Sequence, residues 1–375
     1  MEEIFGTICL AGAIQALLLV FVLIIKKKNR RANLFLSLFL VFGILDLFEL
    51  YLGTKGITAS TGSYQLSIIP YSLIFGPSIF LYIALLTAEI YNFTKKLLLL
   101  YLPFIAALLV NLCLYFTYNL SEMPAYVKYI NVIINGGGVI FELTLYIISL
   151  IILQRYIKRL KEYFSDIDSL KLSLFRIVIV IMIITVFIIY IPFSQESHVR
   201  HDHSILDIIP VIGGLSLIFG LTIAALLQPE TFNKVRLMEN AVAHEETETL
   251  PQYKKLRLSA SEEELYVKKL IDYMSKEKPY LNEELTLQDI ADEISISSHH
   301  LSMILNIHLK QNFYTFINYY RIEDVKEKLA DSLYKSQTIL SIAYSAGFNS
   351  KSTFNTMFKK FTEKTPKEYR SEILI

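Results

Sequence analysis

Long apolar runs dominate the first 227 residues of the chain, and short amphipathic patterns dominate the rest. An apolar run of about 20 residues can cross a bilayer core of about 30 Å as a helix. The runs that approach or exceed this length cover residues 4–25, 32–52, 66–88, 97–117, 130–153, 177–193 and 205–227. The sixth is the shortest, yet it is almost purely apolar from Ile177 to Tyr190. The pattern predicts a bundle of seven transmembrane helices over residues 1–227.

After this region, apolar residues recur at the spacing of amphipathic helices. Two short helices separated by three or four residues form a helix-turn-helix, and such a pair occurs twice, on either side of one long helix. The predicted helices cover residues 261–277, 287–294, 298–309, 313–333, 339–343 and 350–361. The predicted fold class is therefore all-α: a seven-helix transmembrane bundle, then a cytoplasmic domain of two helix-turn-helix units joined by a long linker helix.

Composition and charge support this division of the chain. Of its 375 residues, 53% are hydrophobic and 19% are charged, whereas soluble domains carry about 25% charged residues. Residues 1–227 hold 29 charged side chains and residues 228–375 hold 42. These values exclude a plain cytosolic enzyme, a disordered chain and a disulfide scaffold. We expect a transmembrane sensor domain at 1–227, a linker and coupling helix at 228–279, and a third domain at 280–375.

The loop charges predict the orientation of the bundle. If the N-terminus lies outside, the loops on one side carry 13 cations and those on the other side carry three. The first set comprises Lys26, Lys27, Lys28, Arg30, Arg31, Lys95, Lys96, Arg155, Lys158, Arg159, Lys161, Lys171 and Arg176. The positive-inside rule assigns this set to the cytoplasm. The N-terminus begins with acidic residues, unlike a cleaved signal peptide. We therefore expect a multi-pass protein of the inner membrane, with its N-terminus outside and its C-terminal domain in the cytoplasm.

Acidic residues inside apolar spans are costly and often functional. Asp46 and Glu49 lie three residues apart on the second run, so they share a helix face. Glu142 lies in the fifth run, just after the triplet Gly136–Gly138. One hypothesis is that Asp46, Glu49 and Glu142 line a cavity that senses a ligand or an ion. The alternative is that they form interhelical hydrogen bonds or lie near the outer interface, and that the glycines allow close helix packing.

Cysteine and histidine, which often bind metals, are few in this chain, with two and seven residues. Cys9 and Cys113 both lie in apolar runs, so we expect buried thiols and no cysteine-based metal site. The last outer loop contains His198, His201 and His203, but the intervening Arg200 opposes a cation. We therefore expect no metal and no cofactor, and leave open whether this loop binds zinc.

Residues 280–370 resemble the DNA-binding domain of AraC-type transcription regulators, in which two helix-turn-helix units are joined by a long helix. The residues that carry the resemblance are Leu287-xx-Ile290-Ala291, His300-Leu301-Ser302, Phe316-Ile317-Asn318-xx-Arg321-Ile322, Ile342-Ala343-xxx-Gly347-Phe348-xx-Lys351-Ser352-xx-Asn355-xx-Phe358-Lys359-Lys360 and Thr365-Pro366-xx-Tyr369-Arg370. Phe75-Gly76-Pro77 and Leu227-Gln228-Pro229-Glu230 are similar to a membrane-bound class of these regulators in bacteria related to Bacteroidota.

The resemblance implies which side chains contact DNA. The second helix of each unit would enter the major groove. In the first unit the DNA-contacting residues would be Ser298, His299, His300, Ser302 and Met303, although His300 is as consistent with packing. In the second unit they would be Lys351, Ser352, Thr356, Lys359 and Lys360, of which the lysines suit phosphate or guanine contact. The alternative for Lys359 and Lys360 is a solvated helix face.

Two positions depart from the family pattern. The family often has glycine just after each second helix, where this chain has Lys310 and Glu363. If these positions need a left-handed backbone, each departure destabilises the domain by about 1 kcal/mol. The charge is also modest, because residues 295–375 contain 11 basic and seven acidic residues, whereas residues 240–294 contain seven and 13. These features bear on DNA affinity more than on the fold.

We therefore expect a membrane-anchored one-component transcription regulator that binds promoter DNA under the control of a signal sensed in or across the membrane. Its expected partners are promoter DNA, membrane lipid, a small-molecule or membrane-borne signal, and a second copy of the chain in a homodimer. The alternative is a seven-helix receptor or transporter whose tail is a protein-interaction adaptor without DNA binding. We expect no enzyme activity, because the sequence contains no nucleotide loop, acid–base pair or nucleophile motif.

Overall fold

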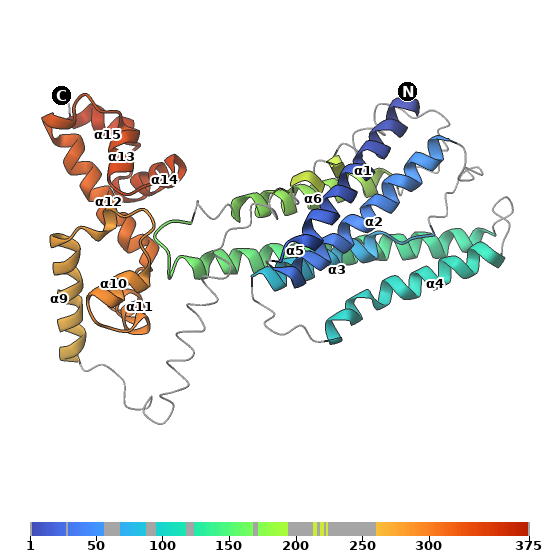
Figure 1. Cartoon of the computed structure of the whole chain (residues 1–375), viewed down its shortest axis with the longest axis horizontal. Coiled ribbons are helices and arrows are strands. Elements are labelled where there is room, and N and C mark those ends of the chain that lie inside the picture. The colour runs from blue at the N-terminus through green and yellow to red at the C-terminus, as the bar shows by residue number, and fades with distance from the viewer. Residues whose placement is uncertain are drawn as a thin grey trace. The chain divides into compact units, whose positions relative to one another are not determined.

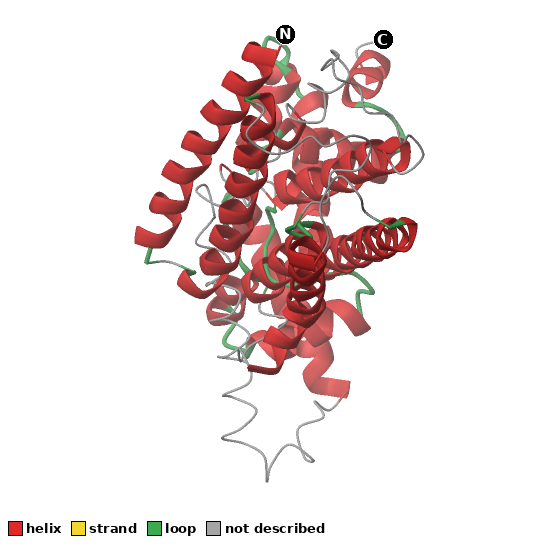
Figure 2. Cartoon of the chain, turned by 90° about the vertical axis from the view of Figure 1, so that its right-hand side faces the viewer, coloured by secondary structure: helices red, strands yellow, loops and turns green. Residues whose placement is uncertain are grey.

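The computed structural model describes residues 2–27, 29–55, 68–87, 95–117, 124–167, 172–193, 213–215, 218–220, 223 and 260–373. Every regular element in these residues is a helix, as Figure 2 shows. The chain divides into two compact units, Met1–Gln154 with Ser173–Gln228, and Arg155–Leu172 with Pro229–Ile375. The predicted all-α class is therefore confirmed for the described part of the chain.

The first unit contains the apolar helices (Figure 1). They are α1 (Glu2–Ile25), α2 (Arg30–Thr54), α3 (Ser72–Leu86), α4 (Leu102–Thr117), most of α5 (Ala125–Leu160) and α6 (Leu172–Phe193), with the 3-10 helix η1 (Lys95–Tyr101) leading into α4. These helices coincide with the first six apolar runs. The seventh run, 205–227, lies mostly outside the described residues, so a count of seven spans stays a prediction.

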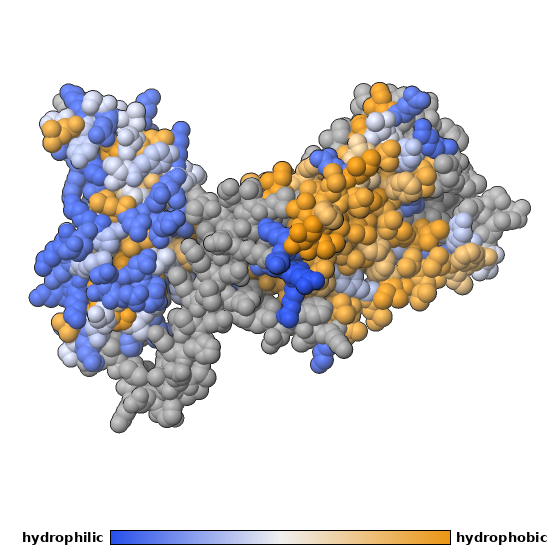
Figure 3. Space-filling model, in the orientation of Figure 1, coloured by the Kyte–Doolittle hydropathy of each residue, from blue (hydrophilic) through white to orange (hydrophobic). Residues whose placement is uncertain are grey.

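Several of these helices suit a membrane. Four described segments are long and apolar enough to cross one, by length and composition: Glu3–Ile25, Arg30–Leu52, Lys96–Thr117 and Val132–Leu160. The apolar helices Ser72–Leu86 and Leu174–Phe187 are shorter. Large apolar side chains also point outward, for example Phe21 at 65% exposure and Ile133 at 72%. In the view of Figure 3, hydrophobic residues cover much of the first unit and hydrophilic residues much of the second. Exposed apolar surface on this scale suits contact with lipid.

Helices α3 and α5 approach each other closely at two glycines. A Cβ atom added at Gly76 would lie 2.9 Å from Cα of Glu142, and one added at Gly138 would overlap the hydroxyl of Ser72. Gly136 and Gly137 have nothing within 4 Å of an added Cβ. Of the glycine triplet, only Gly138 therefore serves close helix packing.

The second unit contains short helices at the positions that the spacing predicts, within a few residues. They are α9 (Ala260–Lys276), η5 (Pro279–Leu281), α10 (Leu287–Glu293), α11 (Ser298–Ile307), α12 (Phe313–Ala330), η6 (Ser332–Tyr334), α13 (Ile339–Ser345), α14 (Lys351–Thr362) and α15 (Pro366–Ile373). The four helices of the two pairs start at N-caps whose side-chain oxygens accept a backbone N–H: Thr286, Ser297, Thr338 and Ser350. Such caps define where each short helix begins.

Helix α12 contributes to two separate hydrophobic cores, and Figure 1 shows it running from one helix pair to the other. Its first half places Phe313, Phe316 and Ile317 in a core with residues of α9, α10 and α11. Its second half places Ile322, Val325 and other residues in a core with α13 and α14. One continuous helix therefore holds both pairs.

The boundary between the two cores is polar and centres on Arg321, which is only 1% exposed. Its Nε donates to the carbonyl of Tyr280 at 2.8 Å, and its Nη2 donates to the carbonyl of Asn282 at 2.8 Å. Burial lowers the pKa of the guanidinium to about 10, so Arg321 stays charged at neutral pH. Satisfied donors of this kind are what a buried arginine requires.

Both positions where the family often has glycine have a positive φ, and so does Gly347. Gly347 has a φ of 91°, and Lys310 and Glu363 have φ values of 51° and 61°. Both departures from glycine thus lie where an L-residue is strained, by about 1 kcal/mol each.

One break between the units, after Gln228, lies next to the predicted boundary at residue 227, but the second unit also takes a segment from within residues 1–227. Residues 155–172, which connect α5 to α6, belong to the second unit. The reason is that this polar stretch pairs its backbone with the helix-turn-helix domain, for example through the amide of Leu287, which donates to the carbonyl of Tyr163 at 2.9 Å.

Candidate DNA-binding surface

Helix α14 presents a polar face that is separate from its buried face. Thr353, Phe354, Met357 and Phe358 are buried in the core. The predicted contact residues of this helix are all exposed, namely Lys351, Ser352, Thr356, Lys359 and Lys360. Helical periodicity produces this separation, since the buried residues recur at spacings of three and four. The structure therefore presents all five predicted contact residues of the second unit to solvent.

The lysines of this face differ in their pairing from Lys326 and Lys328 on α12. Lys328 lies 2.6 Å from a carboxylate oxygen of Asp324, and Lys326 lies 2.9 Å from Glu323. Among the described residues, no carboxylate forms an ion pair with Lys351, Lys359 or Lys360. Lys360 does lie over the ring of Phe361, with Nζ 5.5 Å from the centroid. These three cations are therefore available to phosphate or to guanine.

Helix α11 presents a less exposed face. Leu301, Ile304 and Leu305 are buried, and the other predicted contact residues, His299, His300, Ser302 and Met303, are half-buried. The rings of the two histidines lie side by side with centroids 6.0 Å apart. The spacing of His299, Ser302 and Met303 places them on the side of the helix away from the core.

Ser298 differs from its neighbours, because it is buried and its hydroxyl donates to the side-chain oxygen of Gln288. This contact joins the two helices of the first unit, so we leave Ser298 out of the proposed contact surface. A serine just after a helix cap cannot be assigned to core or groove from its residue type alone.

Two asparagines extend the faces beyond the predicted residues. Asn306 and Asn355 are exposed, and Asn306 donates to the hydroxyl of Ser302 at 3.3 Å. Asparagine can pair with adenine in the major groove through two hydrogen bonds. Their positions, four residues after Ser302 and three after Ser352, follow the helical spacing that indicates a shared face.

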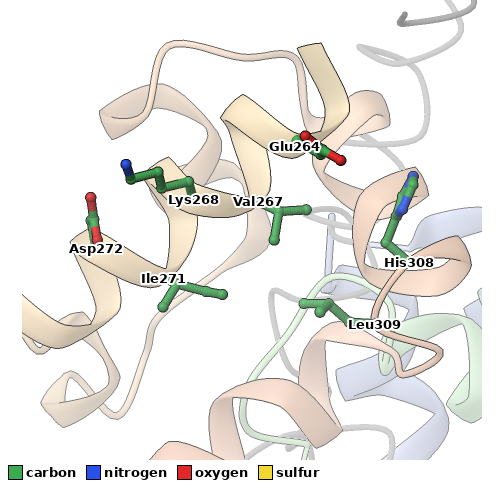
Figure 4. Close-up of a pocket in the computed structure, with 7 residues that line it drawn as sticks. All are labelled: Glu264, Val267, Lys268, Ile271, Asp272, His308 and Leu309. Carbon is green, nitrogen blue, oxygen red and sulfur yellow. The ribbon is translucent and has the colours of Figure 1, made fainter. Parts of the chain in front are cut away.

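An open groove lies between α9 and the end of α11, with a volume of about 430 Å³. Figure 4 shows Val267 and Ile271 of α9 on the side toward His308 and Leu309, whereas Lys268 and Asp272 point away from these two residues. Nε2 of His308 donates across it to Oε2 of Glu263 at 2.9 Å. This contact and the burial of Leu270 and Met274 attach α9 to the first helix-turn-helix unit.

The three acidic residues of the predicted sensing site, Asp46, Glu49 and Glu142, lie in different hydrogen-bonding surroundings. Glu49 accepts from the hydroxyl of Tyr71 at 2.9 Å, which connects α2 to the start of α3. Glu142 is 3% exposed and accepts from the hydroxyl of Tyr146 at 2.7 Å, one turn along α5. Within the described residues, its other carboxylate oxygen has no hydrogen-bond partner. Asp46 is half-buried, and no hydrogen bond joins the three carboxylates to one another in this part of the structure.

One other predicted feature, the outer loop with His198, His201 and His203, lies outside the described residues. Where the structure does describe the chain, no group of three or more His, Cys, Asp or Glu residues is arranged to hold a metal ion.

Comparisons with known proteins match the second unit. A family model described as a helix-turn-helix domain matches residues 290–372. Over 106 residues, 28% of this chain, the sequence is 35% identical to an uncharacterized HTH-type transcriptional regulator of Staphylococcus aureus strain COL. Over 107 residues it is 26% identical to the melibiose operon regulatory protein of Escherichia coli K12. A solved structure from Listeria innocua, of unknown function, matches 28% of this chain at 23% identity, with a TM-score of 0.25.

These matches define the class of the C-terminal part of the chain, which is a helix-turn-helix domain similar to those of transcriptional regulators. The match agrees with the resemblance to AraC-type regulators. The chain spans 13% of the length of the staphylococcal relative and 33% of that of the melibiose regulator. The apolar helices lie outside the segment that the family model matches.

Proposed function

We propose that this protein is a membrane-anchored one-component transcription regulator. The observation that carries the proposal is the exposed face of α14, where three lysines that form no ion pair among the described residues accompany short polar side chains of a double helix-turn-helix domain. In this proposal α11 and α14 enter successive major grooves on one side of the duplex. Lys351, Lys359 and Lys360 contact phosphates or guanine, while Ser302, Ser352 and Thr356 face base edges.

The apolar helices of the first unit support the membrane half of the proposal. They expose large apolar side chains, and the loop cations number 13 on the predicted cytoplasmic side against three on the other. We propose the inner membrane as the location, with the N-terminus outside and the helix-turn-helix domain inside. In this arrangement the protein senses a small-molecule or membrane-borne signal and acts as a regulator rather than an enzyme.

Signal control requires two states of the DNA-binding domain that the signal stabilises differently. Glu142 is the strongest candidate for a signal-sensing residue, because it is buried and one of its carboxylate oxygens has no hydrogen-bond partner among the described residues, which favours a ligand or a proton. Asp46 and Glu49 complete the proposed site on the neighbouring helix α2. Helix α9 is a proposed coupling element, since it precedes the DNA-binding domain and packs on its first unit.

The test is DNA binding by the purified full chain in lipid nanodiscs. Immunoprecipitation of bound genomic fragments identifies candidate operators, and footprinting on those fragments measures protection. We expect protection of two successive major grooves, and affinity that falls steeply with salt as phosphate contacts release counterions.

The triple variant Lys351→Ala, Lys359→Ala and Lys360→Ala tests the role of the lysines. Its matched control is Lys326→Ala, which removes a lysine that is paired with Glu323. We expect the triple variant to lose most of the protection and Lys326→Ala to retain it. If the wild-type chain binds no DNA fragment above a random-sequence control, the adaptor alternative replaces this proposal.

A further inference from the structure

A short segment between two apolar helices packs into the helix-turn-helix domain. Residues 161–167, here called the docked segment, follow α5 and precede α6 in the chain, yet they belong to the same compact unit as α9–α15. Phe164, Ser165 and Asp166 are buried there, at 8%, 1% and 9% exposure. The domain thus holds a piece of chain that the sequence connects on both sides to the apolar unit.

The backbone of the docked segment pairs with the strand-like stretch before α10. The amide of Ser165 donates to the carbonyl of Leu285 at 3.2 Å, and the amide of Leu287 donates to the carbonyl of Tyr163 at 2.9 Å. Phe164 and Thr286 are therefore directly opposite each other in an antiparallel bridge. The two hydrogen bonds flank this pair, which makes it a non-hydrogen-bonded pair with a Cα separation of about 4.5 Å.

The docked segment also joins the two helix-turn-helix units. Tyr163 packs against the core of the first unit and Ile167 against the core of the second. Between them, the carbonyl of Ser165 accepts from Asn318 and from Arg321, each at 3.3 Å. The hydroxyl of Ser165 lies 3.1 Å from Nη2 of Arg321. These contacts restrict the angle between the two units, because the segment touches both and α12 lies between them.

Its acidic side chains contact α11 and the turn directly before α14, the two helices that the proposed function places in DNA. Glu162 accepts from Nδ2 of Asn306 at 3.0 Å, on the face of α11 that includes Ser302. Asp166 accepts from the side chain of Asn349, directly before the N-cap of α14. A carboxylate at each of these positions repels the phosphate backbone that would approach the same helices.

We propose that residues 161–167 act as an internal ligand of the DNA-binding domain, and that the docked state has low affinity for DNA. Release of the segment removes the two carboxylates from the reading helices and frees the angle between the helix-turn-helix units. Since α5 and α6 flank the segment, a movement of these helices changes the balance between docked and released states. The inference rests on the proposed function, because it requires that the domain binds DNA.

A disulfide across the bridge tests this inference. Phe164→Cys with Thr286→Cys is introduced into the full chain carrying Cys9→Ala and Cys113→Ser, in nanodiscs. The expected Cα separation of about 4.5 Å lies within the range of about 4.4–6.8 Å that disulfides tolerate. We expect the pair to cross-link on mild oxidation, and the oxidised protein to bind its operator at least about tenfold more weakly than the reduced protein, which is about 1.4 kcal/mol.

Each single-cysteine variant is the matched control, and its affinity should not change on oxidation. Absence of the cross-link, or equal or tighter DNA binding by the oxidised protein, overturns the inference. The wild-type footprint separates the two hypotheses: if wild type binds no operator, the proposed function itself has failed.

A second variant acts in the opposite direction and leaves the helix-turn-helix residues intact. Ser165→Pro removes the amide that donates to Leu285 and the hydroxyl beside Arg321, while Ser165→Ala removes only the hydroxyl. We expect Ser165→Pro to raise operator affinity and to lower the yield of the 164–286 cross-link, with Ser165→Ala between it and wild type. If Ser165→Pro binds the operator more weakly than wild type while its far-UV circular dichroism is unchanged, the proposed low affinity of the docked state is wrong.

Discussion

Replacing Gly347 with alanine should open the second helix-turn-helix unit. Gly347 has a φ of 91° in the turn between α13 and α14, where an L-residue is strained by about 1 kcal/mol. An added Cβ would also overlap the carbonyl oxygen of Tyr280, and it would lie 3.0 Å from Nε of Arg321 and from the carbonyl carbon of Leu281. These neighbours are backbone atoms or a buried guanidinium, so they cannot move away freely.

The size of the effect follows from these two contributions. Forcing an extra methyl into a packed site destabilises it by about 1–3 kcal/mol, and the backbone strain adds about 1 kcal/mol. The expected total is about 2–4 kcal/mol, against a whole-domain stability of about 5–15 kcal/mol. The domain should stay folded, but the turn should lose its contact with Tyr280, whose carbonyl accepts from Arg321 at 2.8 Å.

Hydrogen exchange followed by mass spectrometry on the full chain in nanodiscs measures this loss. At 1.4 kcal/mol per factor of ten, amides of α13 and α14 should exchange about 30-fold to 700-fold faster in Gly347→Ala than in wild type. Gly137→Ala is the matched control, because an added Cβ there has nothing within 4 Å. Exchange of α13 and α14 within about threefold of wild type in Gly347→Ala would refute the reasoning.

Three further predictions concern the same domain. Lys310→Gly and Glu363→Gly should each stabilise the domain by about 1 kcal/mol, since both residues have a positive φ. Pulse proteolysis should show this as a higher urea midpoint of unfolding, and a lower midpoint in either variant would contradict backbone strain at that position. Ser298→Ala should lower the free energy of unfolding by about 1 kcal/mol and leave operator specificity unchanged. Ser352→Ala should leave stability unchanged and alter the preferred DNA sequence, which binding-site selection with each variant can measure. Phe358→Ala should destabilise the second unit by about 3–5 kcal/mol, because its ring is fully buried and packs edge-to-face on Phe354 and Tyr369; a midpoint close to that of wild type would show that the core relaxes around the cavity.

Local patterns predicted the helices well, because each helix depends on neighbours within a few residues. Thr338 and Ser350 cap their helices, and the apolar spacing within 350–361 identifies Phe354, Met357 and Phe358 as buried. The strained positions Lys310 and Glu363 were also predictable, since both come within three residues of a helix end, where the chain turns. These features need no knowledge of distant parts of the chain.

The contact surface was predictable only in part. For α14, every predicted contact residue is exposed, because a strongly amphipathic helix leaves one choice of face. For α11 the pattern was weaker: Ser298 turned out to be buried against Gln288, and Asn306 shares the face of Ser302 without having been predicted. A small polar residue at a helix start fits a groove or a core equally well, so its neighbours from other helices decide.

The sequence by itself determined the all-helical class, the apolar character of the first 227 residues and the two helix pairs around one long helix, because hydrophobic spacing and capping act over a few residues. Only the tertiary structure decided that residues 161–167 pack into the helix-turn-helix domain. That contact joins residues more than a hundred positions apart, such as Ser165 and Leu285, and depends on backbone hydrogen bonds that any residue but proline can form. A polar loop with this composition therefore has no sequence signal that distinguishes a docked segment from a solvated one.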